Sequence, residues 1–320
     1  KKEGVTSVFG IIDGTYFGLY SNLKKHGIQL ITPRHESSAV HMAGAYARLT
    51  GKLGVCIASN GPGVANALPG VAVEHAEGNR VLLITSSRRP QIMYPDRGGT
   101  YQCFDQSRVI KAMSKYSEVV SFPERIPEMM KQAFRMSYKG RPGVVHVDVP
   151  ENYMNGKSDF IESGFLEPSR YRRTEPISAS STQVQRAAKM LAEANFPMIH
   201  AGSGIVHALA FEELEKVAEI LQAPVLTSWG ARGALCEKNR LSVPMIYIEL
   251  NEEMRKKSDL VLTLGSRISE TDRWGKVPHW GDPAKQKMIQ VDEDDEYLGR
   301  NKPVDLAILS DVKTFLNDLY

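Results

Sequence analysis

The sequence contains few cysteines, and this scarcity limits the kinds of protein it can be. Cys56, Cys103 and Cys236 are odd in number and far apart. They therefore form neither a disulfide framework nor a metal-ligand spacing. The eight histidines are also scattered, without an H-x-x-x-H pair. We expect free thiols, a reducing cytoplasmic location and no metal site within this chain.

Long apolar stretches and blocks of like charge are missing as well. The sequence has no window of 18 consecutive apolar residues, and residues 1–10 lack the apolar core of a signal peptide. We therefore predict neither a transmembrane helix nor a secretory signal. The formal net charge of +3 arises from acidic and basic residues that are mixed along the chain. This mixture predicts no nucleic acid and no membrane as a partner.

The composition that remains is that of a globular protein. The chain has 320 residues, of which 42% are hydrophobic and 24% are charged. A single core rarely grows beyond ~250 residues, so the length favours two domains. In both halves, short apolar segments alternate with helical patterns, which is typical of parallel sheets covered on both faces. We predict an α/β fold with two doubly wound parallel-sheet domains.

A change in composition marks the domain boundary. Residues 156–176 are polar and irregular and end at Pro176, as expected of an interdomain linker. We assign residues 1–155 to a first domain and 177–320 to a second. The predicted strands are Val5–Ile11, Gln29–Thr32, Leu53–Ala58, Val81–Thr85 and Val144–Val149 in the first domain, and 198–204, Pro224–Thr227, Leu260–Gly265 and Lys287–Val291 in the second.

One acidic residue of the first domain is placed where ligands bind. Glu36 follows the predicted strand Gln29–Thr32, and Pro33 disfavours helix at the residue before it. Glu36 therefore lies near a helix N-terminus, where the helix dipole favours an anion. Open α/β sheets bind ligands beyond the carboxyl ends of their strands. These residues alone leave two interpretations open, a functional carboxylate and an acid that only stabilises the helix.

Glycine-rich turns follow strands in both domains. Residues 60–63, with the sequence NGPG, join a strand to a helix of small residues, so the backbone there can approach a ligand or another subunit closely. In the second domain, Gly202 and Gly204 follow a strand, where a phosphate could approach the backbone. Asp292 ends a later strand and could accept hydrogen bonds from a ribose. Each turn is also compatible with a purely structural role.

Several longer motifs occur together in this chain. They are "HESSAVHMAGAYAR", "NGPGVANALPGVA", "YQCFDQ", "GRPGVVHVDVP" and "LGSRISETDRWG". In this combination the chain resembles the acetolactate synthase-like (acetohydroxyacid synthase-like) family of thiamine-diphosphate-dependent enzymes, along essentially its whole length. The resemblance implies that the first domain binds the aminopyrimidine ring of the cofactor. It also implies that the second domain has the nucleotide fold that binds FAD or ADP in several members.

The resemblance assigns expected roles to individual residues. Glu36 matches the family's cofactor-activating glutamate, whose carboxyl group hydrogen-bonds N1′ of the pyrimidine. Gln102 matches a glutamine that lines the substrate pocket. The other residues expected on the pyrimidine side are Asn60, Gly61, Pro62, Gly63 and Asn66. The residues expected at an FAD or ADP site are Gly202, Gly204, Gly265, Arg267, Arg273 and Asp292.

The sequence also departs from the family pattern. Ile12-Asp13 replaces the usual Pro-Gly in a loop that approaches the substrate in relatives, and Asn60 replaces a serine. The G-D-G…N-N motif that supplies oxygen ligands to Mg²⁺ is missing, because Gly281-Asp282 lacks the second glycine and the asparagines. We therefore expect Mg²⁺ to be held by a C-terminal diphosphate-binding domain or subunit outside this sequence. We also expect about one further helix upstream of Lys1.

These observations predict a thiamine-diphosphate-dependent enzyme, a lyase or transferase. The first hypothesis is an acetolactate synthase-like carboligase or decarboxylase that acts on a 2-keto acid. The motif "YQCFDQ" keeps open a 2-hydroxyacyl-CoA lyase or oxalyl-CoA decarboxylase. A third possibility is a non-catalytic nucleotide-binding or regulatory subunit. The resemblance implies a homodimer or homotetramer, or a partner chain that carries the diphosphate-binding domain.

Overall fold

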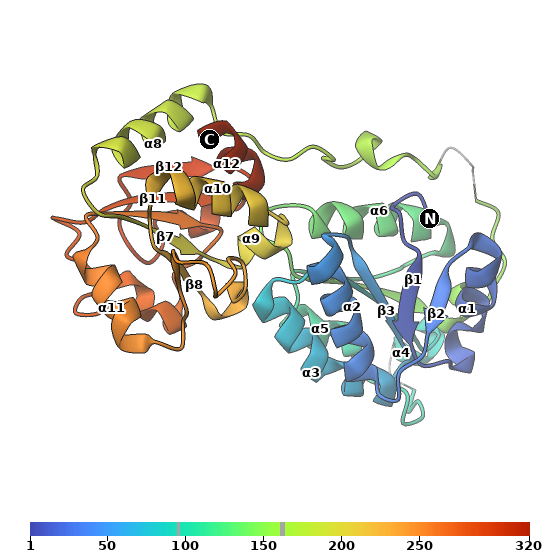
Figure 1. Cartoon of the computed structure of the whole chain (residues 1–320). Helices are drawn as coiled ribbons and strands as arrows, with labels where there is room; N and C mark the ends of the chain where they lie inside the picture. Colours follow the sequence, from blue (N-terminus) through green and yellow to red (C-terminus); the bar gives the residue numbers. More distant parts are fainter. Residues whose placement is uncertain (95–96, 161–163) are drawn as a thin grey trace. The chain divides into compact units, whose positions relative to one another are not determined.

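The computed structural model describes residues 1–94, 97–160 and 164–320. The chain separates into two compact units, Lys1–Thr174 and Glu175–Tyr320. Within the described residues, each unit contains a six-stranded sheet whose paired strands run parallel (Figure 1). The predicted α/β class with two doubly wound domains is confirmed. The predicted domain and linker limits stay predictions.

The sheet of unit 1 is covered by helices on both faces (Figure 1). Because side chains alternate along a strand, Cys56 and Leu83 join one core with α2, α3 and α5, whereas Ile57 and Leu82 join another with α1 and α6. The strands are β1 (Ser7–Gly10), β2 (Gln29–Ile31), β3 (Gly54–Ala58), β4 (Val81–Ser87), β5 (Tyr116–Val119) and β6 (Val144–Pro150). The helices are α1 (Phe17–Leu23), α2 (Glu36–Thr50), α3 (Pro62–Glu77), α4 (Pro90–Met93), α5 (Gln106–Lys111), α6 (Ile126–Ser137) and α7 (Glu151–Met154).

The order of the strands locates a crevice in unit 1. The sheet runs β2-β1-β3-β4-β6-β5. The chain thus leaves β1 on one side to form β2 and returns past it to form β3. Such a reversal is a topological switch point, where open α/β sheets bind ligands beyond the carboxyl ends of the strands. The segments that follow β1, β2 and β3 therefore lie near one another, beyond the carboxyl ends of these strands. We call this side of the sheet the switch-point edge.

The sheet of unit 2 has the order β12-β11-β10-β7-β8-β9, with a switch point between β7 and β10. One core packs it against α8, α9, α10 and α12, and a smaller core around Trp280 covers the other face. The strands are β7 (Pro197–Ala201), β8 (Val225–Thr227), β9 (Ser242–Val243), β10 (Leu260–Leu264), β11 (Lys287–Asp292) and β12 (Leu306–Leu309). The helices are α8 (Ser181–Glu193), α9 (Ser203–His207), α10 (Phe211–Leu221), α11 (Ile248–Lys257) and α12 (Val312–Leu319).

A buried ion pair fastens the two ends of unit 1 together. Arg172 Nη2 lies 2.6 Å from Glu3 Oε2, and the two side chains are 10% and 4% exposed. The Tyr171 hydroxyl donates to the same carboxylate, and the Arg172 guanidinium stacks 3.7 Å from the centroid of the Tyr138 ring. Lys2 Nζ donates to the carbonyl of residue 165 at 2.7 Å. The start of the chain and the segment that leads out of unit 1 are therefore one packed cluster.

Candidate cofactor site

Glu36 is the first residue of α2, as the sequence predicts. His35 caps this helix, because its Nδ1 accepts the N–H of Ser37 at 3.2 Å. The Glu36 side chain is half-buried, and its Oε2 accepts a hydrogen bond from Nδ2 of Asn66 in α3 at 3.2 Å. The Glu36 carboxylate therefore belongs to the N-terminus of α2 and is oriented by one hydrogen bond from the side chain of Asn66.

Gly63 lies beside Ser59 and Glu36. A Cβ atom on Gly63 would lie 2.4 Å from Ser59 Oγ and 3.5 Å from Glu36 Oε1. The first of these distances is well below van der Waals contact, so a side chain here would displace the Ser59 hydroxyl, whereas Glu36 would be in ordinary contact. The structure therefore brings Glu36, Gly63 and Asn66 together, and Ser59 is a neighbour that the sequence did not reveal.

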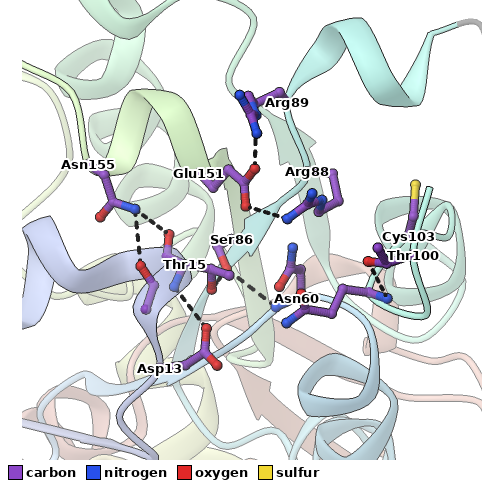
Figure 2. Close-up of polar contacts among 12 residues, drawn as sticks. Asp13, Thr15, Asn60, Ser86, Arg88, Arg89, Thr100, Cys103, Glu151 and Asn155 are labelled. Atoms are coloured by element: carbon purple, nitrogen blue, oxygen red, sulfur yellow. Dashed lines mark hydrogen bonds and ion pairs between the residues drawn. The ribbon is translucent and has the colours of Figure 1, made fainter. Parts of the chain in front are cut away.

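Asn60 lies directly after β3 at the same edge. It is 1% exposed, and its backbone N–H donates to Ser86 Oγ at 3.3 Å. Figure 2 shows it beside Ser86. Within the described part of the chain, neither Nδ2 nor Oδ1 of Asn60 has a hydrogen-bond partner. A buried amide without partners costs about 1–3 kcal/mol, so such a group calls for an outside polar partner.

Gly61 brings Gln102 to this loop. Gly61 has φ +69°, and a Cβ there would lie 2.4 Å from Gln102 Cα, so only glycine fits. Its N–H donates to Gln106 Oε1 at 3.3 Å. Gln102 is half-buried and therefore lies against the Asn60–Gly61 turn. Pro62 is the first residue of α3 and is exposed, and its ring sets the φ that starts the helix.

The loop with the unusual Ile12-Asp13 sequence reaches the same edge (Figure 2). The Asp13 side chain accepts the N–H of Thr15 at 2.8 Å, which caps a short 3₁₀ turn over Gly14–Tyr16. Thr15 Oγ1 then lies 2.6 Å from Ser86 Oγ. Ile12 is 52% exposed. Asp13 thus has a local structural role as a cap, and Ser86 joins this loop to Asn60.

A buried polar network around Gln106 and Asp148 connects to the Asn60–Gly61 turn. It was not predicted from the sequence. Gln106 Nε2 donates to Ser86 O at 2.7 Å and to Asp148 Oδ1 at 3.1 Å. Burial raises the pKa of Asp148 to about 6 and lowers the pKa of the neighbouring His146 to about 3. His146 is therefore neutral at physiological pH. The one available signal was the pair of polar residues in the otherwise apolar strand "VVHVDVP".

The predicted glycines of unit 2 meet at its switch point. A Cβ on Gly202 would lie 2.2 Å from Gly265 O, and Gly204 packs equally closely against Gly265. The N–H groups of Gly202 and Gly204 donate to the carbonyls of Leu264 and Gly265 at 2.8 and 3.0 Å. These two donors are therefore used within the protein, and a phosphate would need other N–H groups.

The remaining predicted residues of unit 2 lie on the loop after β10 and at the end of β11. Arg267 is half-buried, with its guanidinium 5.8 Å from the centroid of the Tyr297 ring. Arg273 is exposed and has φ +54°. Asp292 is buried at the end of β11 and accepts the N–H of Asp294 at 3.1 Å. Arg267 and Asp292 thus lie at the carboxyl ends of two neighbouring strands, whereas Arg273 lies farther along the loop after β10.

Comparison with known proteins decides the family. Residues 1–109 match the model of the N-terminal TPP-binding domain of thiamine pyrophosphate enzymes, and residues 184–319 match the model of their central domain. Together the two matched segments cover most of the chain. The chain belongs to the thiamine pyrophosphate enzyme family. Thiamine pyrophosphate is another name for thiamine diphosphate, so the expected resemblance is confirmed.

The relatives of this family member include several acetolactate synthases. A probable acetolactate synthase large subunit of Methanocaldococcus jannaschii is 30% identical over 100% of this chain and 54% of its own length. An acetolactate synthase of Mycobacterium bovis is 32% identical over 100% of the chain and 51% of its own length. The acetolactate synthase large subunit of Corynebacterium glutamicum is 31% identical over 97% of this chain and 49% of its own length. The chain thus spans about half the length of the curated relatives it matches.

The match to the N-terminal TPP-binding domain includes Glu36, Asn60, Asn66 and Gln102, and the match to the central domain includes the glycine cluster of unit 2. In residues 1–94, 97–160 and 164–320, no three His, Cys, Asp or Glu side chains are arranged to hold a metal ion. The described helices are too short or too polar to span a bilayer.

Proposed function

We propose that this chain forms the pyrimidine-binding and central parts of a thiamine-diphosphate-dependent carboligase or decarboxylase that acts on a 2-keto acid. The position of Glu36 carries the proposal. This carboxylate starts α2 at the switch-point edge of the sheet and is bound by Asn66. The named relatives favour this function over the CoA-thioester lyase and the non-catalytic subunit.

The residues around Glu36 fit the pyrimidine end of the cofactor. Asn66 donates to Glu36 Oε2 and leaves Oε1 to accept or donate a hydrogen bond, depending on its proton. We assign Glu36 the task of sharing a proton with a ring nitrogen, which is general acid–base work. The buried amide of Asn60 offers a donor and an acceptor that lack partners among the described residues. When bound, thiamine diphosphate supplies the electron sink for decarboxylation.

Gln102 and Ile12 are the candidates for contacts with substrate. The backbone of Gln102 is fixed against Gly61, while its side chain is half-buried and can reach a small polar substrate. Ile12 exposes an apolar side chain near the same edge. Because apolar surfaces associate in water, we propose that Ile12 favours a 2-keto acid whose apolar side chain can contact it.

The proposal extends to cofactors and assembly. Mg²⁺ would accompany the diphosphate on a domain or subunit other than this chain. FAD or ADP would bind unit 2 near Arg267, Arg273 and Asp292, with a structural rather than redox role. We also propose a cytoplasmic homodimer or homotetramer, or a complex with a chain that carries the diphosphate-binding domain. The glycine cluster at Gly202 and Gly265 would shape this region rather than bind phosphate, because its amide donors are already used.

Replacement of Glu36 by Gln tests the proposal. The full-length protein would be loaded with thiamine diphosphate and Mg²⁺, and exchange of the C2 proton for deuterium would be followed by NMR. We expect at least a 100-fold slower exchange in Glu36→Gln, because removal of a positioned acid or base typically costs ~10²–10⁴ in rate. The control is Glu77→Gln at the exposed end of α3. Exchange at the wild-type rate in Glu36→Gln would show that Glu36 has no such role.

A further inference from the structure

Unit 1 contains a cavity apart from the residues assigned to the cofactor. It has a volume of ≈ 310 Å³ and lies at the carboxyl ends of β4, β5 and β6. Asp148 and Gln106 form a polar part of its lining, and Met93, Val119 and Val120 form an apolar part. Pockets that bind small molecules combine an apolar wall with a few convergent polar groups. Its lining does not include Glu36, Asn60 or Gln102.

Asp148 is a buried acid without a cationic partner. Its residue is 2% exposed, and in the part of the chain that the structure describes, no Lys, Arg or His forms an ion pair with it. The adjacent His146 cannot serve, because burial keeps it neutral by lowering its pKa to about 3. Fully buried carboxylates are almost always paired or coordinated.

Neutral hydrogen bonds do not fully compensate this charge. Thr85 and Gln106 donate to Asp148 Oδ1 at 2.9 and 3.1 Å, and Ser107 lies 3.4 Å from Oδ2. These bonds lower the pKa of Asp148, but desolvation is the larger effect, and the pKa is raised to about 6. The carboxylate therefore carries an electrostatic cost that a cation in the cavity would remove.

The other charged residues of the lining leave the cavity negative. Arg88 also lines it, and its Nη1 shares the Glu151 carboxylate with Arg89 Nε, at 3.0 and 3.2 Å. This group keeps one positive charge in excess, which is outweighed only by the carboxylates of Asp148 and Asp105 together. Asp105 adds a second acid at the lining, and its carboxylate accepts the N–H of Arg108. The lining of the cavity therefore combines the acidic side chains of Asp105 and Asp148 with an apolar part. This combination suits a cation that carries a short hydrocarbon chain.

We propose that this cavity is a binding site for a small organic ammonium ion, with the Asp148 carboxylate as its counter-charge and the side chains of Met93, Val119 and Val120 around its hydrocarbon part. The volume lies at the low end of the ~300–1,000 Å³ typical of ligand pockets. A ligand of this size has few atoms, so we expect a dissociation constant in the millimolar range. Gln106 links Asp148 to Gly61 of the cofactor site, but the lining of the cavity includes none of the residues assigned to the cofactor.

Thermal unfolding of the full chain with defined probes tests the proposal. Propylammonium chloride and ethanolammonium chloride are the cationic probes, with sodium chloride, 1-propanol and sodium propionate as matched salt, neutral and anionic controls. A ligand that binds only the folded state stabilises it by RT ln(1 + [L]/Kd), so the unfolding midpoint keeps rising with ligand concentration above Kd. We expect both ammonium salts to raise the midpoint of the wild-type protein along this logarithmic curve, with a Kd in the millimolar range, and the three controls to leave it unchanged.

Two variants locate the site. Asp148→Asn keeps the size of the side chain and the acceptor for Gln106, and it should weaken binding at least tenfold. Ser121→Trp at the exposed rim should block entry without a change at the carboxylate, and it covers the case in which Asp148→Asn fails to fold. Glu124→Gln, at an exposed acid outside the lining, should bind as the wild type does.

Three results would overturn the proposal. They are a wild-type midpoint that does not respond to the ammonium salts beyond sodium chloride, an equal response to 1-propanol, and undiminished ammonium binding in a folded Asp148→Asn or Ser121→Trp variant. An ammonium response that follows this logarithmic dependence, is lost in the folded pocket variants and is kept in Glu124→Gln would support it.

Discussion

Asp148→Asn should make the unliganded protein more stable at neutral pH. Asp148 is fully buried among neutral hydrogen-bond donors, and burial raises its pKa from 3.8 to about 6. The folded state therefore holds this proton more tightly than the unfolded state. As the pH rises from about 4 to about 6, the unfolded chain releases its proton first, so the free energy of unfolding falls with increasing pH in this window.

The size of the effect follows from the two pKa values. The pKa rises from 3.8 in the unfolded chain to about 6 in the folded protein. At about 1.4 kcal/mol per pKa unit, this shift lowers the free energy of unfolding by about 3 kcal/mol, and the full loss is reached above pH ~7. About 1.4 kcal/mol of this loss develops between pH ~5 and pH ~7.5. Asparagine carries no charge and keeps an acceptor for Thr85 and Gln106. A less favourable hydrogen bond from its amide would offset about 1 kcal/mol of the gain.

Urea unfolding of both proteins at several pH values between about 5 and about 7.5 checks this reasoning. The difference in unfolding free energy, variant minus wild type, should increase by about 1.4 kcal/mol over that range. His146 and the other titrating groups are common to both proteins, so their contributions cancel in the difference. A difference that stays flat with pH, or that decreases, would refute the assignment of a raised pKa to a charged, uncompensated Asp148.

Two further substitutions test the packing of unit 1, each against a matched control. Gly61→Ala should lower the free energy of unfolding by about 2–4 kcal/mol, because a backbone atom 2.4 Å from its Cβ adds overlap to the strain of a positive φ; Gly4→Ala, with φ +76° and open space, should cost only about 1 kcal/mol, and equal losses in urea unfolding would contradict the overlap. Arg172→Met leaves the buried carboxylate of Glu3 unpaired and should cost about 3–5 kcal/mol. Arg125→Met, in an exposed pair, should cost less than about 1 kcal/mol, and a similar loss for both in denaturant melts would show that burial of the Glu3 pair is unimportant.

The elements with a strong local signal could be predicted from the sequence. The helix Glu36–Thr50 begins at Glu36, which the sequence places near a helix N-terminus, because Pro33 fixes its earliest start. Gly51 ends the helix in the left-handed conformation. The strand β5 (Tyr116–Val119) was missed. Its residues include a serine and a glutamate, and it forms because β6 offers an edge to pair with, which is a tertiary rather than a local cause.

The strand predicted over residues 198–204 ends earlier than expected, at Ala201. Gly202 instead caps α9, since the turn must bend back at the switch point and pack against Gly265. The β9 and β12 strands were also missed. β9 has two residues, and β12 alternates buried and exposed positions at a sheet edge. Such short edge strands depend on their neighbours and carry little local signal.

The candidate site was predictable only as far as its motifs extend. Glu36 and Asn66 were named from motifs, and the structure places them in contact. The isolated amide of Asn60 and the charge of Asp148 could not be predicted, because each depends on which distant groups surround it. Gln106, for example, contacts Gly61 and Asp148, which are 45 and 42 residues away in the sequence. Contacts of this range are determined by the sheet order and not by any local pattern.

The clustered ion pair of Glu3 and Arg172 has a consequence for how unit 1 is used as a part. Its polypeptide enters and leaves at a single corner, so the strands and helices in between form a closed circuit. A domain whose two ends lie close together tolerates insertion into another protein, and it tolerates circular permutation at its loops, because neither change disrupts its core. The ion pair between Glu3 and Arg172 then holds together the two ends of a domain that can be transferred as a unit.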